Sequence, residues 1–207
     1  MKSRTPITEE GIVVGNVYPK YSTKNPLARY LVRGYLSSLD RLVITVNPGS
    51  IHEVGCGEGF IISRFVEKGR TLTGSDFSRK TIDEARRNSP DPSISFKVAS
   101  IYELTPQDSA SLILCCEVLE HLESPEKALG NLAKIANPYL LVSVPREPIW
   151  RILNVLRGSY LGSLGNTPGH FQHWSRSSFL HFLGQYFEVL KVETPLPWIM
   201  ALCRKRS

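Results

Sequence analysis

Short strand-like runs and segments with a helical period alternate along the middle of the chain. The runs are apolar, rich in β-prone residues, and lie at positions 50–54, 71–76, 95–100, 111–116 and 139–144. The fourth run, SLILCC, is continuously apolar, as expected of a strand buried on both faces. This alternation predicts a doubly wound, mostly parallel α/β sheet with helices on both faces. In such a sheet the ligand lies beyond the carboxyl ends of the strands, where the strand order reverses.

Capping residues indicate where the helices begin. Asn25 followed by Pro26 predicts the start of a leading amphipathic helix, because Asn is a preferred N-cap and Pro is preferred at the first helical position. Its predicted apolar face contains Leu27, Tyr30, Leu31, Gly34, Tyr35 and Leu39. Further helices are expected over residues 59–69, 78–88 and 124–136, the last two capped by Ser78 and Ser124.

The pattern changes after Pro145. A short apolar helix is followed there by a long loop that contains glycines and histidines. Long loops in compact domains are usually functional, so this segment is predicted to be a lid or a substrate-binding insertion. A helix over residues 175–183 and two strands joined by a turn around Thr194 and Pro195 then add an antiparallel C-terminal hairpin to the sheet.

Composition narrows the class of protein. The chain has 207 residues, of which 42% are hydrophobic, enough for one sizeable core. It has no apolar run of about 20 residues and no hydrophobic leader segment, so we expect no membrane association. Its four cysteines show no CxxC spacing, which favours a reducing, cytoplasmic location. The formal charge of +6 comes from scattered basic residues, which are more often a solvated surface than a nucleic-acid site.

The stretch IHEVGCGEGF contains the strongest chemical signal. Glycines at 55, 57 and 59 follow a strand, and glycine is needed where backbone approaches a ligand or takes positive φ. Glu53 precedes this turn and would repel a pyrophosphate, but it suits an ammonium group. Asp76 lies 21 residues beyond Gly55, the offset at which an acid binds ribose hydroxyls. A sugar together with a cationic amino acid indicates a nucleoside–amino acid cofactor.

Two motifs resemble those of a known family. Residues 53–59 read E-V-G-C-G-E-G and residues 74–78 read G-S-D-F-S. They are similar to the first two motifs, E/D-x-G-x-G-x-G and G-x-D-x-S, of the Rossmann-like (class I) S-adenosylmethionine-dependent methyltransferases. LILCCEVLEHLESP and YLLVSVP look like the family's fourth-strand and fifth-strand motifs. The resemblance covers roughly residues 48 to 204.

The resemblance implies a set of cofactor-binding residues. They are Glu53, Gly55, Cys56, Gly57, Asp76, Phe77, Ser100, Ile101, Cys116, Glu117 and Tyr21. Within this set the two glycines would pack against the methionine part, Asp76 would bind the ribose, Phe77 would border the adenine, and Cys116 and Glu117 would lie near the sulfonium. Many members have an acid at the position of Ser100, whose hydroxyl can still form hydrogen bonds.

The family's domain plan implies one methyltransferase domain over residues 1–207. A helical lid would occupy residues 1–48 and the cofactor-binding core residues 49–145. The substrate-binding insertion would span 146–178, and the C-terminal helix and hairpin 179–207. Tyr18 and Tyr21 would fold over the cofactor as part of the lid, or equally serve as core aromatics.

The acceptor is predicted less directly. Members that methylate DNA or glutamine carry N/D-P-P-Y/F after the fourth strand, where this chain has C-C-E-V. This difference favours an oxygen or nitrogen of a small molecule as the acceptor. RNA is the alternative acceptor, and a member that binds the cofactor without methyl transfer, or uses the sulfonium for another reaction, is the alternative class. Trp150, Trp174 and Trp198 either line an apolar acceptor pocket or belong to the core.

Three histidines are candidate general bases. His121, His170 and His173 come from the end of the fourth strand and from the predicted lid, both of which border the expected methyl group. His52, within a strand, and His181, within a helix, are expected to be structural.

A divalent metal is a further candidate. Glu117, Glu120 and His121 have i, i+3, i+4 spacing, so they would share one face if EVLEHL is helical, and carboxylates with imidazole can bind a divalent cation. The stretch also resembles metal-dependent 2′-O-methyltransferases of small-RNA 3′ ends and O-methyltransferases of ubiquinone biosynthesis, which implies His170 as a fourth ligand. In the alternative, Glu117 caps the turn, Glu120 is solvated, and His121 is a general base or a substrate contact.

Overall fold

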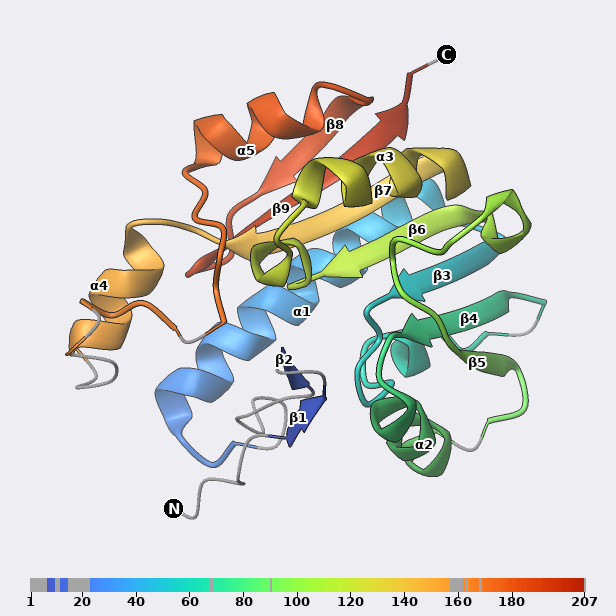
Figure 1. Cartoon of the computed structure of the whole chain (residues 1–207), viewed down its shortest axis with the longest axis horizontal. Helices are drawn as coiled ribbons and strands as arrows, with labels where there is room; N and C mark the ends of the chain where they lie inside the picture. Colours follow the sequence, from blue (N-terminus) through green and yellow to red (C-terminus); the bar gives the residue numbers. More distant parts are fainter. Residues whose placement is uncertain are drawn as a thin grey trace.

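The computed structural model describes residues 7–9, 12–14, 23–67, 69–89, 91–156, 162, 164–167 and 169–206. Within them one sheet (Figure 1) contains β3 (Ser50–Val54), β4 (Thr71–Asp76), β5 (Ile94–Val98), β6 (Ala110–Cys116), β7 (Ala136–Pro145), β8 (Phe187–Glu193) and β9 (Trp198–Lys205). The α-helices are α1 (Pro26–Val46), α2 (Arg79–Asn88), α3 (Pro125–Ile135), α4 (Ile149–Leu156) and α5 (Arg176–Leu183). Short 3-10 helices are η2 (Ile62–Phe65), η3 (Pro106–Asp108) and η4 (Leu119–His121). The strands β1 (Ile7–Glu9) and β2 (Ile12–Val14) pair with each other in a separate antiparallel sheet.

The order of the strands confirms the predicted fold class. They run β5-β4-β3-β6-β7-β9-β8, with parallel pairing from β5 to β7 and antiparallel pairing of β9 with β7 and β8. The chain proceeds outward from β3 through β4 to β5 on one side and from β6 to β7 on the other. The order therefore reverses between β3 and β6, and the predicted antiparallel hairpin forms the edge beyond β7. This is a Rossmann-like α/β sheet whose ligand site is expected at the carboxyl ends of β3 and β6.

Helices cover both faces of the sheet. On β6, Ile113 and Cys115 contribute to the core cluster that also contains residues of α3 and α5, whereas Leu112 and Leu114 contribute to the cluster that contains residues of α1 and α2. In Figure 1 α3 and α5 lie in front of the sheet and α1 lies behind it. Burial on both faces explains why this strand is continuously apolar instead of alternating.

The first helix begins where its cap predicts, but only its second half is buried. The Asn25 side chain accepts hydrogen bonds from the backbone N–H groups of Leu27 and Ala28, at 3.0 and 3.1 Å. Tyr35 and Leu39 are buried in the core, whereas the side chains of Leu27 and Tyr30 are 66% and 74% exposed. The predicted apolar face is therefore wrong at its start. Residues 35–43 pack as a core element, although they fall inside the predicted lid segment.

The helix predicted over residues 59–69 is also wrong. Among the described residues of this stretch, 59–67 and 69, the helical structure is the four-residue η2, and Phe60 and Val66 are more than a third exposed. Gly59 has a φ of +80°, which is incompatible with a right-handed helix through the turn. The backbone is extended again at Val66, so the apolar spacing did not correspond to a continuous helical face.

Among the described helices, none combines the length and the apolar composition that crossing a bilayer requires.

Candidate active site

The glycine turn is fixed to the neighbouring strand by its backbone. The N–H groups of Gly55 and Cys56 both donate to the carbonyl oxygen of Ser75, at 2.7 and 2.9 Å. Gly55 and Gly57 have φ values of +75° and +52°, a region that side chains disfavour. A Cβ atom on Gly55 would lie 2.4 Å from Cγ2 of Val118, whereas one on Gly57 would have no neighbour within 4 Å. Packing therefore requires glycine at position 55, and open space lies beside position 57.

Glu53 fixes the segment that follows the glycine turn. Its side chain is 2% exposed, and Oε2 accepts a hydrogen bond of 2.8 Å from the backbone N–H of Ile62, in the first turn of η2. A carboxylate at the start of a helical turn satisfies N–H groups that have no partner within the helix. The acid that the sequence assigns to the cofactor thus also shapes the loop around it.

Asp76 joins the two motifs at the end of β4. One carboxylate oxygen accepts from the N–H of Gly57 at 3.1 Å and the other from the N–H of Ser78 at 3.0 Å. An ionised carboxylate can accept about four hydrogen bonds, so these contacts are compatible with two sugar hydroxyls. The negative charges of Asp76 and Glu53 also act on the nearby thiol of Cys56. Burial, and then the charges of Glu53 and Asp76, raise the pKa of Cys56.

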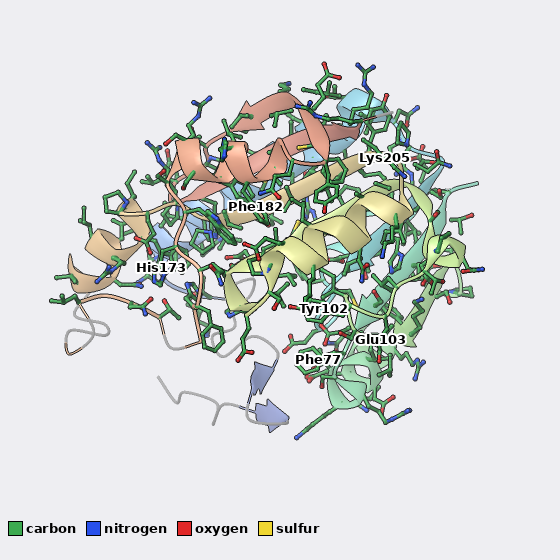
Figure 2. All side chains as sticks on the ribbon, turned by 45° about the horizontal axis from the view of Figure 1, so that its top comes forward. Phe77, Tyr102, Glu103, His173, Phe182 and Lys205 are labelled. Atoms are coloured by element: carbon green, nitrogen blue, oxygen red, sulfur yellow. The ribbon has the colours of Figure 1, made fainter. Side chains whose placement is uncertain are left out.

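The predicted adenine side is formed by the ends of β4 and β5. Phe77 is 40% exposed and Ile101 is buried. The hydroxyl of Ser100 accepts from the N–H of Tyr102 at 3.3 Å, and the N–H of Ser100 donates to Glu103 at 3.2 Å. Figure 2 shows Phe77 near Tyr102 and Glu103. Many family members have an acid at the position of Ser100, and here Glu103 supplies a carboxylate to the same loop. The sequence pointed to Glu103 only through its place in that loop.

Cys116 and Glu117 end β6 beside the glycine turn. Burial, and then the charge of Glu53, raise the pKa of the Cys116 thiol to about 12, against hydrogen bonds from Tyr35 and Ser143. Glu117 has a φ of +56°, and its Oε1 accepts a hydrogen bond of 2.6 Å from the indole N–H of Trp198. The backbone therefore does not continue as a helix from Glu117, and the expected shared helical face is wrong. Trp198 is a partner that the sequence did not suggest.

Glu120, His121 and His170 lie close together at the carboxyl end of β6. Each offers a ligand atom, and these atoms lie within 4.8 Å of one another. Glu120 is 1% exposed, and the two imidazole rings are edge to face with centroids 4.8 Å apart. His121 Nδ1 lies 2.9 Å from the carbonyl oxygen of Gly169. Since a carbonyl oxygen only accepts, this contact requires the proton on Nδ1 of His121.

Backbone hydrogen bonds fasten the histidine loop to η4. The N–H groups of Phe171 and Gln172 both donate to the carbonyl oxygen of Glu120, at 2.8 and 3.1 Å. The Gln172 amide donates to the carbonyl oxygen of Leu122 at 3.0 Å. These contacts join residues about 50 positions apart, which explains why no local pattern predicted them.

The remaining predicted residues lie elsewhere. His173 Nε2 is 2.8 Å from Oδ1 of Asn166 and belongs to the surface beside α4 (Figure 2). His52 is buried between the hydroxyl of Ser75 and the carbonyl of Asp108, both at 2.8 Å, as expected of a structural residue. Tyr18 and Tyr21 lie outside the described residues, so their role over the cofactor stays a prediction.

The tryptophans divide between core and site. Trp174 is buried against the aromatic side chains of Phe179 and Phe182. Trp150 is partly buried, and its ring lies 5.9 Å from that of His170 and 5.8 Å from that of Trp198. Trp198 is 6% exposed and belongs to the core, so Trp150 is the tryptophan that places partly exposed apolar surface beside the histidine cluster.

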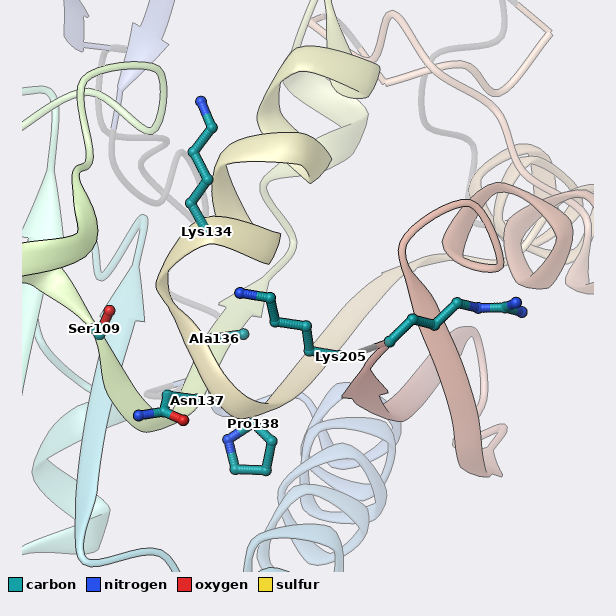
Figure 3. A pocket seen from close by; sticks show the side chains of 7 residues that line it. Ser109, Lys134, Ala136, Asn137, Pro138 and Lys205 are labelled. Atoms are coloured by element: carbon teal, nitrogen blue, oxygen red, sulfur yellow. The ribbon is translucent and has the colours of Figure 1, made fainter.

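A separate cavity of about 370 Å³ lies at the opposite end of the sheet (Figure 3). It is lined by Ser109, Lys134, Ala136, Asn137, Pro138, Lys205 and Arg206. The side chains of Lys134 and Lys205 point in different directions in Figure 3, so their charges do not converge on one position. None of the predicted site residues lines this cavity.

Comparison with known proteins agrees with this geometry. Residues 52–140 match a family model described as a methyltransferase domain. The ubiquinone biosynthesis O-methyltransferase of Coxiella burnetii is 26% identical over 174 residues, which cover 74% of each chain.

Solved methyltransferases share the fold. Magnesium protoporphyrin IX methyltransferase from Synechocystis, with bound S-adenosylhomocysteine, has a TM-score of 0.68 at 18% identity, covering 89% of this chain and 90% of that one. The N-methyltransferase NodS from Bradyrhizobium japonicum, also with S-adenosylhomocysteine, has a TM-score of 0.68 at 18% identity, covering 91% and 92%. The motif residues, the strand order and these matches all agree with a class I S-adenosylmethionine-dependent methyltransferase.

Proposed function

We propose that the chain methylates an oxygen of a small molecule with the help of a divalent metal held by Glu120, His121 and His170. The observation that carries this proposal is the closeness of their ligand atoms, within 4.8 Å, at the carboxyl end of β6. Val118, which precedes η4, is also the residue that packs on Gly55. The cluster and the cofactor turn therefore adjoin each other.

The residues of the turn fit the cofactor. Open space beside Gly57 admits a ligand against bare backbone, and Asp76, held by two N–H groups, presents a carboxylate to a sugar. Buried Glu53 and half-buried Asp76 place negative charge that suits a cation, and their charges are, after burial, the next causes of the raised pKa of Cys56. S-adenosylmethionine bound there supplies a methyl group already activated for in-line displacement.

The donor set of the cluster fits a divalent cation. Two imidazoles and one carboxylate suit zinc, manganese or iron, and the contact of His121 Nδ1 with the carbonyl oxygen of Gly169 is the kind of outer contact that orients a ligating imidazole. A metal held by these three residues would lower the pKa of an acceptor hydroxyl. Without a metal, His121 Nε2 can itself accept the proton of the acceptor, so the same residue serves in both versions of the proposal.

Two features support a small, flat acceptor that reacts at oxygen. Trp150, which is partly buried, places aromatic surface beside His170, which suits an apolar ring. The Coxiella relative is named an O-methyltransferase of ubiquinone biosynthesis. We therefore expect phenols or catechols to be better acceptors than amines.

The test combines cofactor binding with methyl transfer. S-adenosylhomocysteine should raise the melting temperature, and labelled methyl should pass from S-adenosylmethionine to members of a panel of catechols and phenols. A chelator should abolish transfer, and added magnesium, manganese or zinc should restore it. Glu120→Gln and His170→Ala should each lower the rate at least about a hundredfold, whereas His181→Ala, on α5, serves as the histidine control.

Each result bears on a different part of the proposal. Full activity in chelator, together with a large loss in His121→Ala, would contradict the metal and favour His121 as the base. Transfer only to amines would contradict the oxygen acceptor. The absence of any thermal shift with S-adenosylhomocysteine would contradict the cofactor site itself.

A further inference from the structure

Polar side chains of α4 hold the loop that carries His170. Asn154, only 4% exposed, donates from its amide to the carbonyl oxygen of Gly165 at 2.9 Å and to the hydroxyl oxygen of Thr167 at 3.2 Å. The indole N–H of Trp150 donates to the same hydroxyl oxygen at 3.0 Å. One threonine hydroxyl therefore accepts hydrogen bonds from two consecutive turns of α4.

Thr167 also contacts the backbone of His170. Its carbonyl oxygen accepts from the N–H of His170 at 3.1 Å. The indole that its hydroxyl anchors lies against the His170 ring, with the centroids 5.9 Å apart and the planes 29° from parallel. Both the main chain and the ring of His170 thus depend on groups bonded to Thr167.

The other side of the His170 loop is held by η4. Gly169, with a φ of +86°, directs its carbonyl oxygen to Nδ1 of His121 at 2.9 Å. His170 therefore stands between α4, through Thr167, and η4, through Gly169. Small displacements of a reacting group can change rates greatly, so the anchor on α4 has consequences for the site.

We infer that Thr167 is a positioning residue for His170. Its hydroxyl fixes the Trp150 indole, and the indole and the Thr167 carbonyl together keep the His170 ring turned to Glu120 and His121. The catalytic part of this inference rests on the proposed function, whereas the structural part does not. Valine has the shape of threonine but no acceptor, so the indole N–H of Trp150 would lose its hydrogen bond to Thr167, whereas Asn154 would keep its hydrogen bond to Gly165. Serine retains the acceptor.

The experiment compares Thr167→Val with Thr167→Ser. The readout independent of activity is the NMR signal of the His170 ring, assigned with His170→Gln. Contact with the indole should shift the ring protons upfield in the unmodified protein. Thr167→Val should move them toward the values of an exposed histidine, and Thr167→Ser should leave them in place. Thr45→Val makes the same change at an exposed threonine of α1 that bonds only to the carbonyl of Arg41, and it should change neither signal nor rate.

The kinetic expectation is a loss in kcat with little change in KM for S-adenosylmethionine. Thr167→Val should lower kcat and metal affinity about tenfold or more, the range seen when an outer partner of a metal ligand is removed. Thr167→Ser should retain most of the kcat and most of the metal affinity. If Thr167→Val does not fold, Trp150→Phe removes the donor to Thr167 and keeps an aromatic ring, and it should also move the His170 signal.

The outcomes separate the two claims. A His170 signal unchanged in Thr167→Val, or in Trp150→Phe where that variant is used, overturns the inference. A signal that moves while kcat stays constant overturns the role in catalysis. If the unmodified protein transfers no methyl group and the signal still responds to Thr167→Val, the proposed function fails and Thr167 remains the anchor of His170.

Discussion

The two halves of the candidate site are held together in different ways. In the cofactor half, backbone hydrogen bonds join Gly55 and Cys56 to Ser75, and the carboxylates of Glu53 and Asp76 accept from further backbone N–H groups. The acceptor half consists of η4, α4 and residues 164–173, and side chains of Trp150, Asn154 and Gln172 make many of its contacts. Backbone contacts persist through many substitutions, whereas side-chain contacts are lost with one. The comparison teaches that the glycine turn should keep its shape through most side-chain changes outside Glu53 and Asp76, whereas single side-chain changes should loosen the acceptor half.

The largest effect is expected where the two halves touch. Gly55→Ala would place a Cβ 2.4 Å from Cγ2 of Val118 and force a side chain into positive φ. Left-handed strain and overpacking together should cost about 3 kcal/mol in the free energy of unfolding. Gly57→Ala meets only the strain, because no atom lies within 4 Å, and should cost about 1 kcal/mol. Denaturant melts of the two variants measure the difference.

A double variant isolates the clash. Adding Val118→Ala to Gly55→Ala should recover the overpacking part, so the two changes should be non-additive. Equal costs for Gly55→Ala and Gly57→Ala would show that the halves are not in contact at Val118.

A smaller effect is expected from removing the acid of the cofactor half. Asp76→Ala deletes both acceptors of the Gly57 and Ser78 N–H groups as well as the group expected to bind the sugar. A charged hydrogen-bond acceptor contributes about 2 kcal/mol, so affinity for S-adenosylhomocysteine should fall about thirtyfold. Calorimetric titration measures this, with Asp83→Ala on α2 as the control. An affinity within twofold of the unmodified protein would contradict the assignment of Asp76.

The same difference between the halves decided what the sequence could predict. The partners Gly55 and Ser75, or Gly57 and Asp76, are about 20 residues apart, so motif spacing was sufficient to place the strands, the turn and the acid. The failed prediction of a helix after Gly59 shows the limit of periodicity, because positive φ values in the turn override apolar spacing.

The acceptor half depended on contacts that no local pattern encodes. His170 was a candidate base from its place in the predicted lid and a candidate ligand through a resemblance, but its closeness to His121 follows from the way the loop folds back over η4. Thr167 carried no signal at all, since a threonine in a loop is ordinary until two donors of α4 are found on its hydroxyl. The positive φ of Glu117 likewise cannot be deduced from its neighbours in sequence.

Loosening the acceptor half should lower methyl transfer without changing cofactor binding. Gln172→Ala removes the side-chain hydrogen bond to Leu122 at a cost of about 1 kcal/mol or less. Methyl transfer should fall severalfold, while affinity for S-adenosylhomocysteine stays unchanged. Amide exchange should accelerate at Phe171 and Gln172 but not at Gly55. Acceleration at all three amides would mean that the halves open as one unit, against the comparison. Gln185→Ala, beyond α5, is the control.

The smallest expected effect is on the pH dependence of the melting temperature. It tests whether His52, buried on β3, helps to stabilise the cofactor half. Burial is the main cause that lowers the pKa of His52, which lies on β3 between Ser75 and Asp108. A lowered pKa means that the unfolded chain binds the proton more readily, so this stabilisation is complete above about pH 6.5 and is lost as pH falls below that value. Melting temperatures measured from about pH 8 to pH 5.5 should decline less in His52→Gln than in the unmodified protein. His181→Gln should retain the full decline, and an equal reduction in both variants would mean that His52 is not the group responsible.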